Sequence, residues 1–131
     1  MAKILIVEDN ALNIKLFCDL LAAHGHEPQA VTDSRFAYDA ARQFSPDLVI
    51  TDIQLPHVSG LELIRILRGD EELKEVPIMA VTAYSAQGDE DRIRAAGAQA
   101  YVSKPISVVR FVEQVTALLE PNAEAREPQT T

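Results

Sequence analysis

Short apolar runs rich in β-branched residues recur along the chain, and longer segments with helical spacing separate them. The runs are Ile4–Val7, Leu48–Thr51, Ile78–Val81 and Ala100–Val102, with a weaker one at Pro28–Val31. Each run is too short for a helix but long enough for a buried strand. Strands that alternate with helices predict an α/β domain, in which a parallel sheet is covered by helices on both faces.

Residues that favour helix ends agree with this division. The clearest helical pattern lies near the C-terminus, at Val108, Phe111, Val112, Val115, Leu118 and Leu119. Glycines that favour the position just past a helix are Gly25 and Gly97, and candidate N-caps are Asn10, Ser34, Ser59 and Ser107. The pattern predicts one domain over residues 1–119. Residues 120–131 contain two prolines and no large apolar residue, so we expect them to form a disordered tail.

The charge balance excludes several classes of function. Twenty acidic residues against twelve basic ones give a net charge of −8, which repels a phosphate backbone, so we expect no direct binding of nucleic acid. The single cysteine cannot form an internal disulfide, and the N-terminus lacks the features of a signal peptide. No apolar run reaches the roughly 18 residues of a membrane helix. We therefore expect a cytoplasmic protein without membrane insertion.

Polar residues stand where four of the predicted strands end. Glu8 and Asp9 follow the first strand, Asp52 the third, Thr82 the fourth and Lys104 the fifth. Taken singly, each residue has an ordinary structural explanation as a cap, a loop acid or a solvated charge. The carboxyl ends of parallel strands meet at one edge of the sheet, where ligands bind. The joint placement therefore predicts one shared site.

The residue types at this edge suit phosphoryl chemistry. Three carboxylates oppose each other's ionisation unless cations lie among them. Lys104 supplies one positive charge, and Mg²⁺ suits oxygen ligands better than zinc or copper does. Asp52 stands alone on the middle strand and is the best candidate nucleophile, while Lys104 and Thr82 can hold phosphoryl oxygens. The acidic loop Glu8–Ala11 argues against a flavin or dinucleotide, which needs a phosphate-cradling loop there.

At these residues the sequence resembles the receiver domain of two-component response regulators. The resemblance spans Lys3–Leu119 and rests on the blocks Ile4–Asn10, Asp47–Pro56 with Ser59-Gly60, Ala80–Ala83 and Tyr101–Ile106. It implies a flavodoxin-like (CheY-like) fold with a five-stranded parallel sheet in the order 2-1-3-4-5. It further implies that Asp52 accepts a phosphoryl group from a histidine kinase or phosphotransferase.

The resemblance also assigns roles to single residues. It implies that Mg²⁺ is held by Glu8, Asp9, Asp52 and the backbone carbonyl of Gln54. It implies phosphoryl contacts from Thr82 and Lys104, a switch residue at Tyr101 and a cis bond between Lys104 and Pro105. One departure is Glu8 itself, because many receivers carry two aspartates at the acidic pair.

The output is expected to be protein binding. The helix predicted over residues 89–96 offers only Ile93 and small alanines to the core. We therefore expect residues 82–88 and this helix to shift on phosphorylation, altering a face shared with the fifth strand and the last helix. The expected partners are a sensor histidine kinase or phosphatase and a downstream signalling protein, and the chain is expected to be a monomer or weak dimer.

Two alternatives remain open at this point. One is a receiver that binds proteins without phosphorylation. The other is a magnesium-dependent phosphohydrolase with an aspartate nucleophile, but such enzymes carry a second aspartate two residues after the nucleophile, where this chain has Gln54. We therefore expect no enzyme, but a phosphoacceptor limited to its own phosphotransfer and slow autodephosphorylation.

Overall fold

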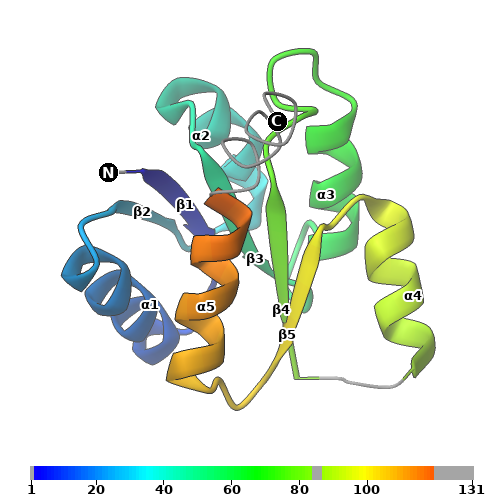
Figure 1. The fold of residues 1–131 in the computed structure, drawn as a ribbon. Coiled ribbons are helices and arrows are strands. Elements are labelled where there is room, and N and C mark those ends of the chain that lie inside the picture. Colours follow the sequence, from blue (N-terminus) through cyan, green and yellow to red (C-terminus); the bar gives the residue numbers. More distant parts are fainter. Residues whose placement is uncertain (1, 84–86, 120–131) are drawn as a thin grey trace, which may run out of the picture.

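A five-stranded parallel sheet forms the centre of the molecule (Figure 1). The computed structural model describes residues 2–83 and 87–119, without the side chains of residues 87–89. The strands are β1 (Lys3–Val7), β2 (Glu27–Val31), β3 (Leu48–Asp52), β4 (Ile78–Thr82) and β5 (Ala100–Ser103). Neighbouring strands run parallel in the order β2-β1-β3-β4-β5. The expected α/β fold and strand order are confirmed.

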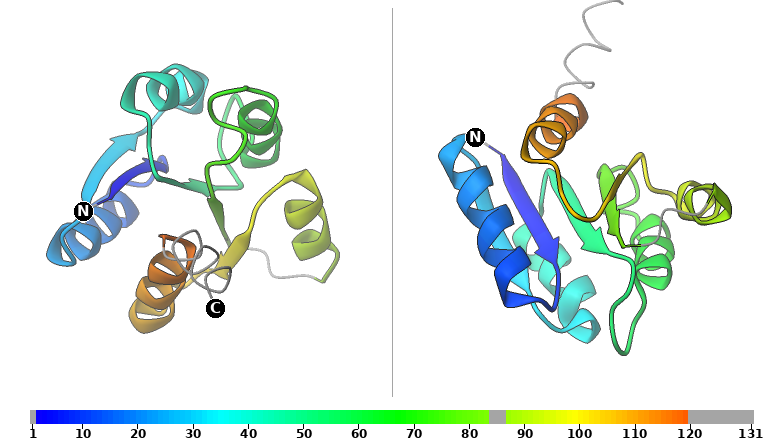
Figure 2. Two further views of the ribbon diagram at one scale, coloured as in Figure 1. Left: turned by 45° about the horizontal axis from the view of Figure 1, so that its top comes forward. Right: turned by 90° about the horizontal axis from the view of Figure 1, so that it is seen from below.

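Within the described residues, five α-helices cover the two faces of this sheet (Figure 2). They are α1 (Ala11–Ala23), α2 (Ala37–Phe44), α3 (Gly60–Arg68), α4 (Gln87–Ala96) and α5 (Val108–Leu119). Helices α1 and α5 pack on one face, and α2, α3 and α4 pack on the other. Every residue of β3 and β4 is buried, as expected for strands covered on both sides.

The face under α1 and α5 is held by aromatic packing. The rings of Phe17 and Phe111 stack with their centroids 5.0 Å apart, and both side chains are buried. Leu21 and Val115 are buried beside them. Cys18 is half-buried against the same cluster, in line with the packing position that its helix neighbours predict.

Most of the predicted helix ends are correct. Asn10 and Ser59 accept hydrogen bonds from the first turns of α1 and α3, and Ser59 forms a capping box with Glu62. The Ser107 hydroxyl likewise accepts from the Arg110 backbone N–H at the start of α5. Gly97, just past α4, has φ 129°, a conformation that favours glycine.

The prediction that Ser34 is a helix N-cap is wrong. Asp33 caps a 3₁₀ turn over Ser34–Phe36, and α2 begins only at Ala37 without a side-chain cap. The Ser34 hydroxyl instead bonds the backbone of Pro56 and Val58. A partner distant in sequence has overridden the local preference of serine for helix starts.

Two further expectations fall partly on residues outside the described ranges. The expected tail over residues 120–131 lies outside them, as do residues 84–86 of the segment expected to shift. Among the described residues, no helix combines the length and the apolar character needed to span a membrane.

Candidate functional site

The predicted polar residues meet at the carboxyl edge of the sheet. The Lys104 ammonium, just after β5, lies 2.8 Å from Oδ2 of Asp52 and 3.5 Å from Oε1 of Glu8. Glu8, Asp52 and Thr82 are buried, whereas Asp9 is exposed. The Lys104 backbone N–H donates to the Thr82 carbonyl over 2.7 Å. The structure therefore brings the ends of four strands into one charged cluster.

Local backbone bonds set the positions of the two buried acids. The Asn10 backbone N–H donates to Oε2 of Glu8 over 3.2 Å, and the Gln54 backbone N–H donates to Oδ1 of Asp52 over 3.0 Å. Gly60, the first residue of α3, lies against the backbone of Asp52. A Cβ at this position would overlap the Asp52 carbonyl oxygen. Glycine is thus required for α3 to approach the end of β3.

Burial and mutual repulsion act on the charges of this cluster. Burial, followed by the charge of Asp52, raises the pKa of Glu8, against the opposing effect of Lys104. Burial lowers the pKa of Lys104, but its hydrogen bond to Asp52 and the charges of Asp52 and Glu8 outweigh this and leave that pKa raised. Lys104 therefore stays charged and neutralises only part of the acidic cluster.

The donor set fits a hard divalent cation. One carboxylate oxygen from each of Glu8, Asp9 and Asp52 lies within 4.8 Å of the other two. Oε1 of Glu8 is buried and has no hydrogen-bond partner, although the Lys104 ammonium lies 3.5 Å away. Carboxylate oxygens without sulfur or imidazole ligands suit Mg²⁺, and a cation would complete the interactions of the orphaned oxygen.

The other predicted site residues lie in the loop after β3, on β5 and just after β5. Gln54 is exposed in the loop between β3 and α3. Tyr101 is half-buried on β5, and its hydroxyl lies 3.5 Å from Oγ of Ser103. The peptide bond between Lys104 and Pro105 is cis. Tyr101 packs against the apolar cluster beneath α2, α3 and α4, whereas Lys104 contacts the acids directly.

Sequence reasoning missed two buried polar groups. One is Ser34, which was expected to cap a helix. The other is Asp70, after α3, which accepts hydrogen bonds from the Tyr38 hydroxyl, the Arg42 guanidinium and the Glu72 backbone. Tyr38 and Arg42 lie 32 and 28 residues away in sequence. No local pattern marks partners this distant.

Comparisons with known proteins define the class. The response regulator receiver domain family matches residues 4–116, and the chain belongs to this family. The polar-differentiation response regulator DivK of Brucella ovis is 53% identical over 116 residues, which cover 88% of this chain and 94% of that protein. DivK of Brucella anthropi is 52% identical over the same coverage.

Solved structures of similar proteins agree with the fold. The Vibrio cholerae chemotaxis protein CheY4 aligns with a TM-score of 0.86 at 25% identity, covering 91% of this chain and 99% of that one. The receiver domain of a sensor histidine kinase from Pseudomonas aeruginosa aligns with a TM-score of 0.83 at 30% identity, covering 90% and 97%. That structure has a magnesium ion coordinated in its active-site cleft.

Proposed function

We propose that this chain is a single-domain response regulator whose Asp52 accepts a phosphoryl group from a phosphohistidine of a partner kinase or phosphotransferase. The observation that carries the proposal is the contact between Lys104 and Asp52, 2.8 Å long, beside the buried Oε1 of Glu8, which has no hydrogen bond. A buried aspartate that contacts a fixed cation and lies close to two further acids matches an acyl-phosphate site. The receiver domain occupies residues 1–119 in this proposal.

The residues divide the chemistry between them. An Asp52 carboxylate oxygen attacks phosphorus, the bond from phosphorus to the histidine nitrogen breaks, and the freed imidazole keeps the electron pair. Lys104 and Thr82 hold phosphoryl oxygens, and Glu8, Asp9, Asp52 and the Gln54 carbonyl hold Mg²⁺. When bound, the metal neutralises charge on the transferred phosphoryl group. The chain thus catalyses only the phosphorylation of its own Asp52. The acyl phosphate is then hydrolysed slowly, and no separate substrate is turned over.

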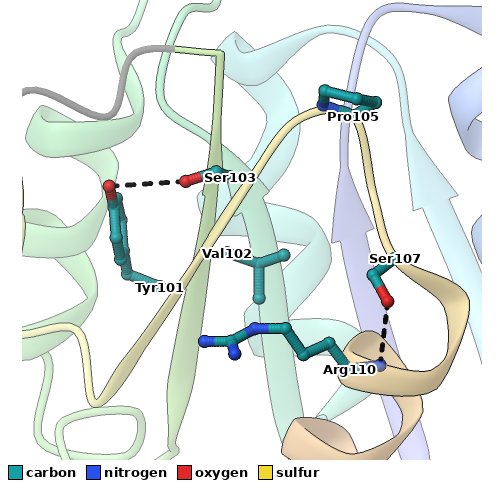
Figure 3. A pocket seen from close by; sticks show the side chains of 6 residues that line it. All are labelled: Tyr101, Val102, Ser103, Pro105, Ser107 and Arg110. Carbon is teal, nitrogen blue, oxygen red and sulfur yellow. Dashed lines mark hydrogen bonds between the residues drawn. The ribbon is translucent and has the colours of Figure 1, made fainter.

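The output lies on the face formed by α4, β5 and α5. A phosphoryl group adds about −1.5 to −2 charges at the edge of the sheet, drawing the Thr82 hydroxyl inward and allowing Tyr101 to turn. Tyr101 lines a pocket of about 280 Å³ together with Val102, Pro105 and Arg110, and Figure 3 shows these side chains. Rotation of Tyr101 would reshape this pocket and so change the binding of a partner protein.

Helix α4 is the element suited to move. Between residues 90 and 96, where its side chains are described, only Ile93 and Ala96 are buried. Little apolar burial opposes a shift of this helix. Amide exchange of residues 87–96 should therefore change on phosphorylation, and unchanged exchange would rule this switch out.

The expected partners follow from the class of the chain. They are a sensor histidine kinase or phosphatase and a downstream signalling protein. This chain binds them in the cytoplasm as a monomer or weak dimer. The similar proteins are polar-differentiation regulators, which supports a role in cell-cycle or polarity control. The net charge of −8 argues against direct contact with nucleic acid.

The test is phosphate incorporation from a small acyl-phosphate donor, followed on a phosphate-affinity gel. The native chain should be labelled only with Mg²⁺, and Asp52→Asn should remain unlabelled. Absence of labelling under conditions that label an established receiver would favour the alternative of a phosphate-independent binding domain. Continuous release of phosphate from a small monoester would instead favour a phosphohydrolase.

A further inference from the structure

We propose that the Ser34 hydroxyl is a positioning group for the metal end of the site. It holds the loop between β3 and α3, residues 53–59, and thereby raises the affinity for Mg²⁺. The inference rests on the proposed function, which assigns the Gln54 carbonyl of this loop to the metal. It gives a role to a buried polar side chain that touches neither Asp52 nor the acidic pair.

The hydroxyl of Ser34 uses both its donor and its acceptor capacity on this loop. The side chain is 3% exposed. Oγ donates to the Pro56 carbonyl over 2.8 Å and accepts from the Val58 N–H over 3.1 Å. His57, between these two residues, has φ 73°, a left-handed conformation that costs energy for a residue with a Cβ. A single hydroxyl from a distant turn therefore bridges a tight bend.

The base of the loop is fixed separately from this bend. The Ile53 N–H donates to the Val81 carbonyl over 3.0 Å, and the Gly60 N–H donates to the Ile53 carbonyl over 2.9 Å. In the described ranges, Ser34 is the group that holds the bend at 56–58 by hydrogen bonds. Gln54 lies between the fixed base and the bridged bend, so the direction of its carbonyl depends on both.

Removal of the hydroxyl should therefore loosen the bend and spare the base. The Pro56 carbonyl is in an exposed residue, so water can replace the lost bond without fixing the geometry. Groups that orient metal ligands typically contribute about 10- to 100-fold to metal affinity. Because Ser34 acts on the Gln54 carbonyl only through Pro56 and Leu55, we expect an effect at the lower end of this range, about tenfold. The chemistry of Asp52 at saturating Mg²⁺ should not change.

The experiment compares Ser34→Ala with Asp33→Ala in the full chain. Asp33 caps the same 3₁₀ turn through the Arg35 N–H, so its variant disturbs the turn but keeps the bridging hydroxyl. Backbone amide NMR during titration with Mg²⁺ gives the dissociation constant and shows that each variant is folded. We expect a dissociation constant about tenfold higher in Ser34→Ala and within about twofold of native in Asp33→Ala.

Two further measurements distinguish a positioning role of Ser34 from a general loss of structure in Ser34→Ala. The Val58 amide should exchange faster with solvent in Ser34→Ala, and the labelling rate from an acyl-phosphate donor should match the native rate once Mg²⁺ saturates. Native Mg²⁺ affinity in Ser34→Ala, equal weakening in Asp33→Ala, or an unchanged Val58 exchange rate would each overturn the inference. If the native chain binds no Mg²⁺ at all, the proposed function fails as well, which distinguishes the two failures.

Discussion

Two clusters of buried acid are built in opposite ways: one lies around Asp70, just after α3, and the other lies at the carboxyl edge of the sheet. Around Asp70, both carboxylate oxygens have donors: Tyr38 and Arg42 bond Oδ2, and the Glu72 backbone bonds Oδ1. At the carboxyl edge, Oε1 of Glu8 is buried without a hydrogen bond, and the Lys104 ammonium 3.5 Å from it is shared with Asp52. The first cluster is complete within the protein, and the second is not.

The pKa shifts of Asp70 and Glu8 differ in the same way: the first pKa is lowered and the second is raised. The hydrogen bond from Tyr38, with those from the Glu72 backbone and Arg42, holds the pKa of Asp70 at about 2 despite burial. Burial and the charge of Asp52 raise the pKa of Glu8. An acid whose donors are all supplied stabilises the fold, whereas an acid left short of positive charge is costly until a cation binds. Incompleteness therefore marks the functional cluster.

The largest expected effect comes from removing the fixed cation of the incomplete cluster. Lys104→Met should lower the rate of labelling by an acyl-phosphate donor by at least about 100-fold, the usual cost of losing one group that stabilises a charged transition state. Initial rates at saturating Mg²⁺ provide the measurement. Arg42→Met, which removes the cation from the Asp70 cluster, should leave the rate near native. Equal losses in both variants would erase the distinction between the clusters.

Disruption of the complete cluster should instead affect stability. Asp70→Asn weakens the bonds to Tyr38 and Arg42 and should lower the midpoint of thermal unfolding by several degrees, with labelling unchanged. Glu71→Gln, an exposed neighbour, serves as the control and should shift the midpoint little. A native midpoint in Asp70→Asn would show that the cluster contributes nothing to stability.

The pH dependence of stability should follow from the depressed pKa of Asp70. Between about pH 4 and about pH 2, Asp70 is protonated in the unfolded chain but remains ionised in the folded chain. Stability is therefore present above this window and is lost as pH falls through it. The pKa of Asp33 is also held at about 2 by Arg35, so Asp33→Asn is the matched comparison. Asp70→Asn should show a flatter acid profile in thermal unfolding, and an unchanged slope would contradict the assignment.

A smaller and opposite effect is expected at the incomplete cluster. Glu8→Gln removes a carboxylate whose ionised form is disfavoured, so it should raise the unfolding midpoint of the metal-free chain by a few degrees at neutral pH. Added Mg²⁺ should erase this advantage, because only the native carboxylate gains from the cation. A lower midpoint in metal-free Glu8→Gln would mean that the native charge is already well compensated.

Local patterns in the sequence were sufficient to predict the α/β class and the meeting of the charged residues, whereas the strand order came from the resemblance to receiver domains. Apolar runs define the strands, and the residues that follow each run must reach the same edge of a parallel sheet. Lys104 and Asp52, 52 residues apart, were placed together on that ground alone. The role of Ser34 was predicted wrongly and Asp70 was not found, since their partners come from helices and loops whose relative packing leaves no periodic signal.

The most direct test of the contrast between the clusters is the response of thermal unfolding to Mg²⁺. A ligand that binds only the folded state stabilises it by about 2.7 kcal/mol at a concentration 100 times its dissociation constant. The native chain and Asp70→Asn should both become more stable as Mg²⁺ is added, and Asp9→Asn should respond far less. A native chain indifferent to Mg²⁺, or an Asp9→Asn variant that responds as the native chain does, would contradict a metal-dependent site at the carboxyl edge.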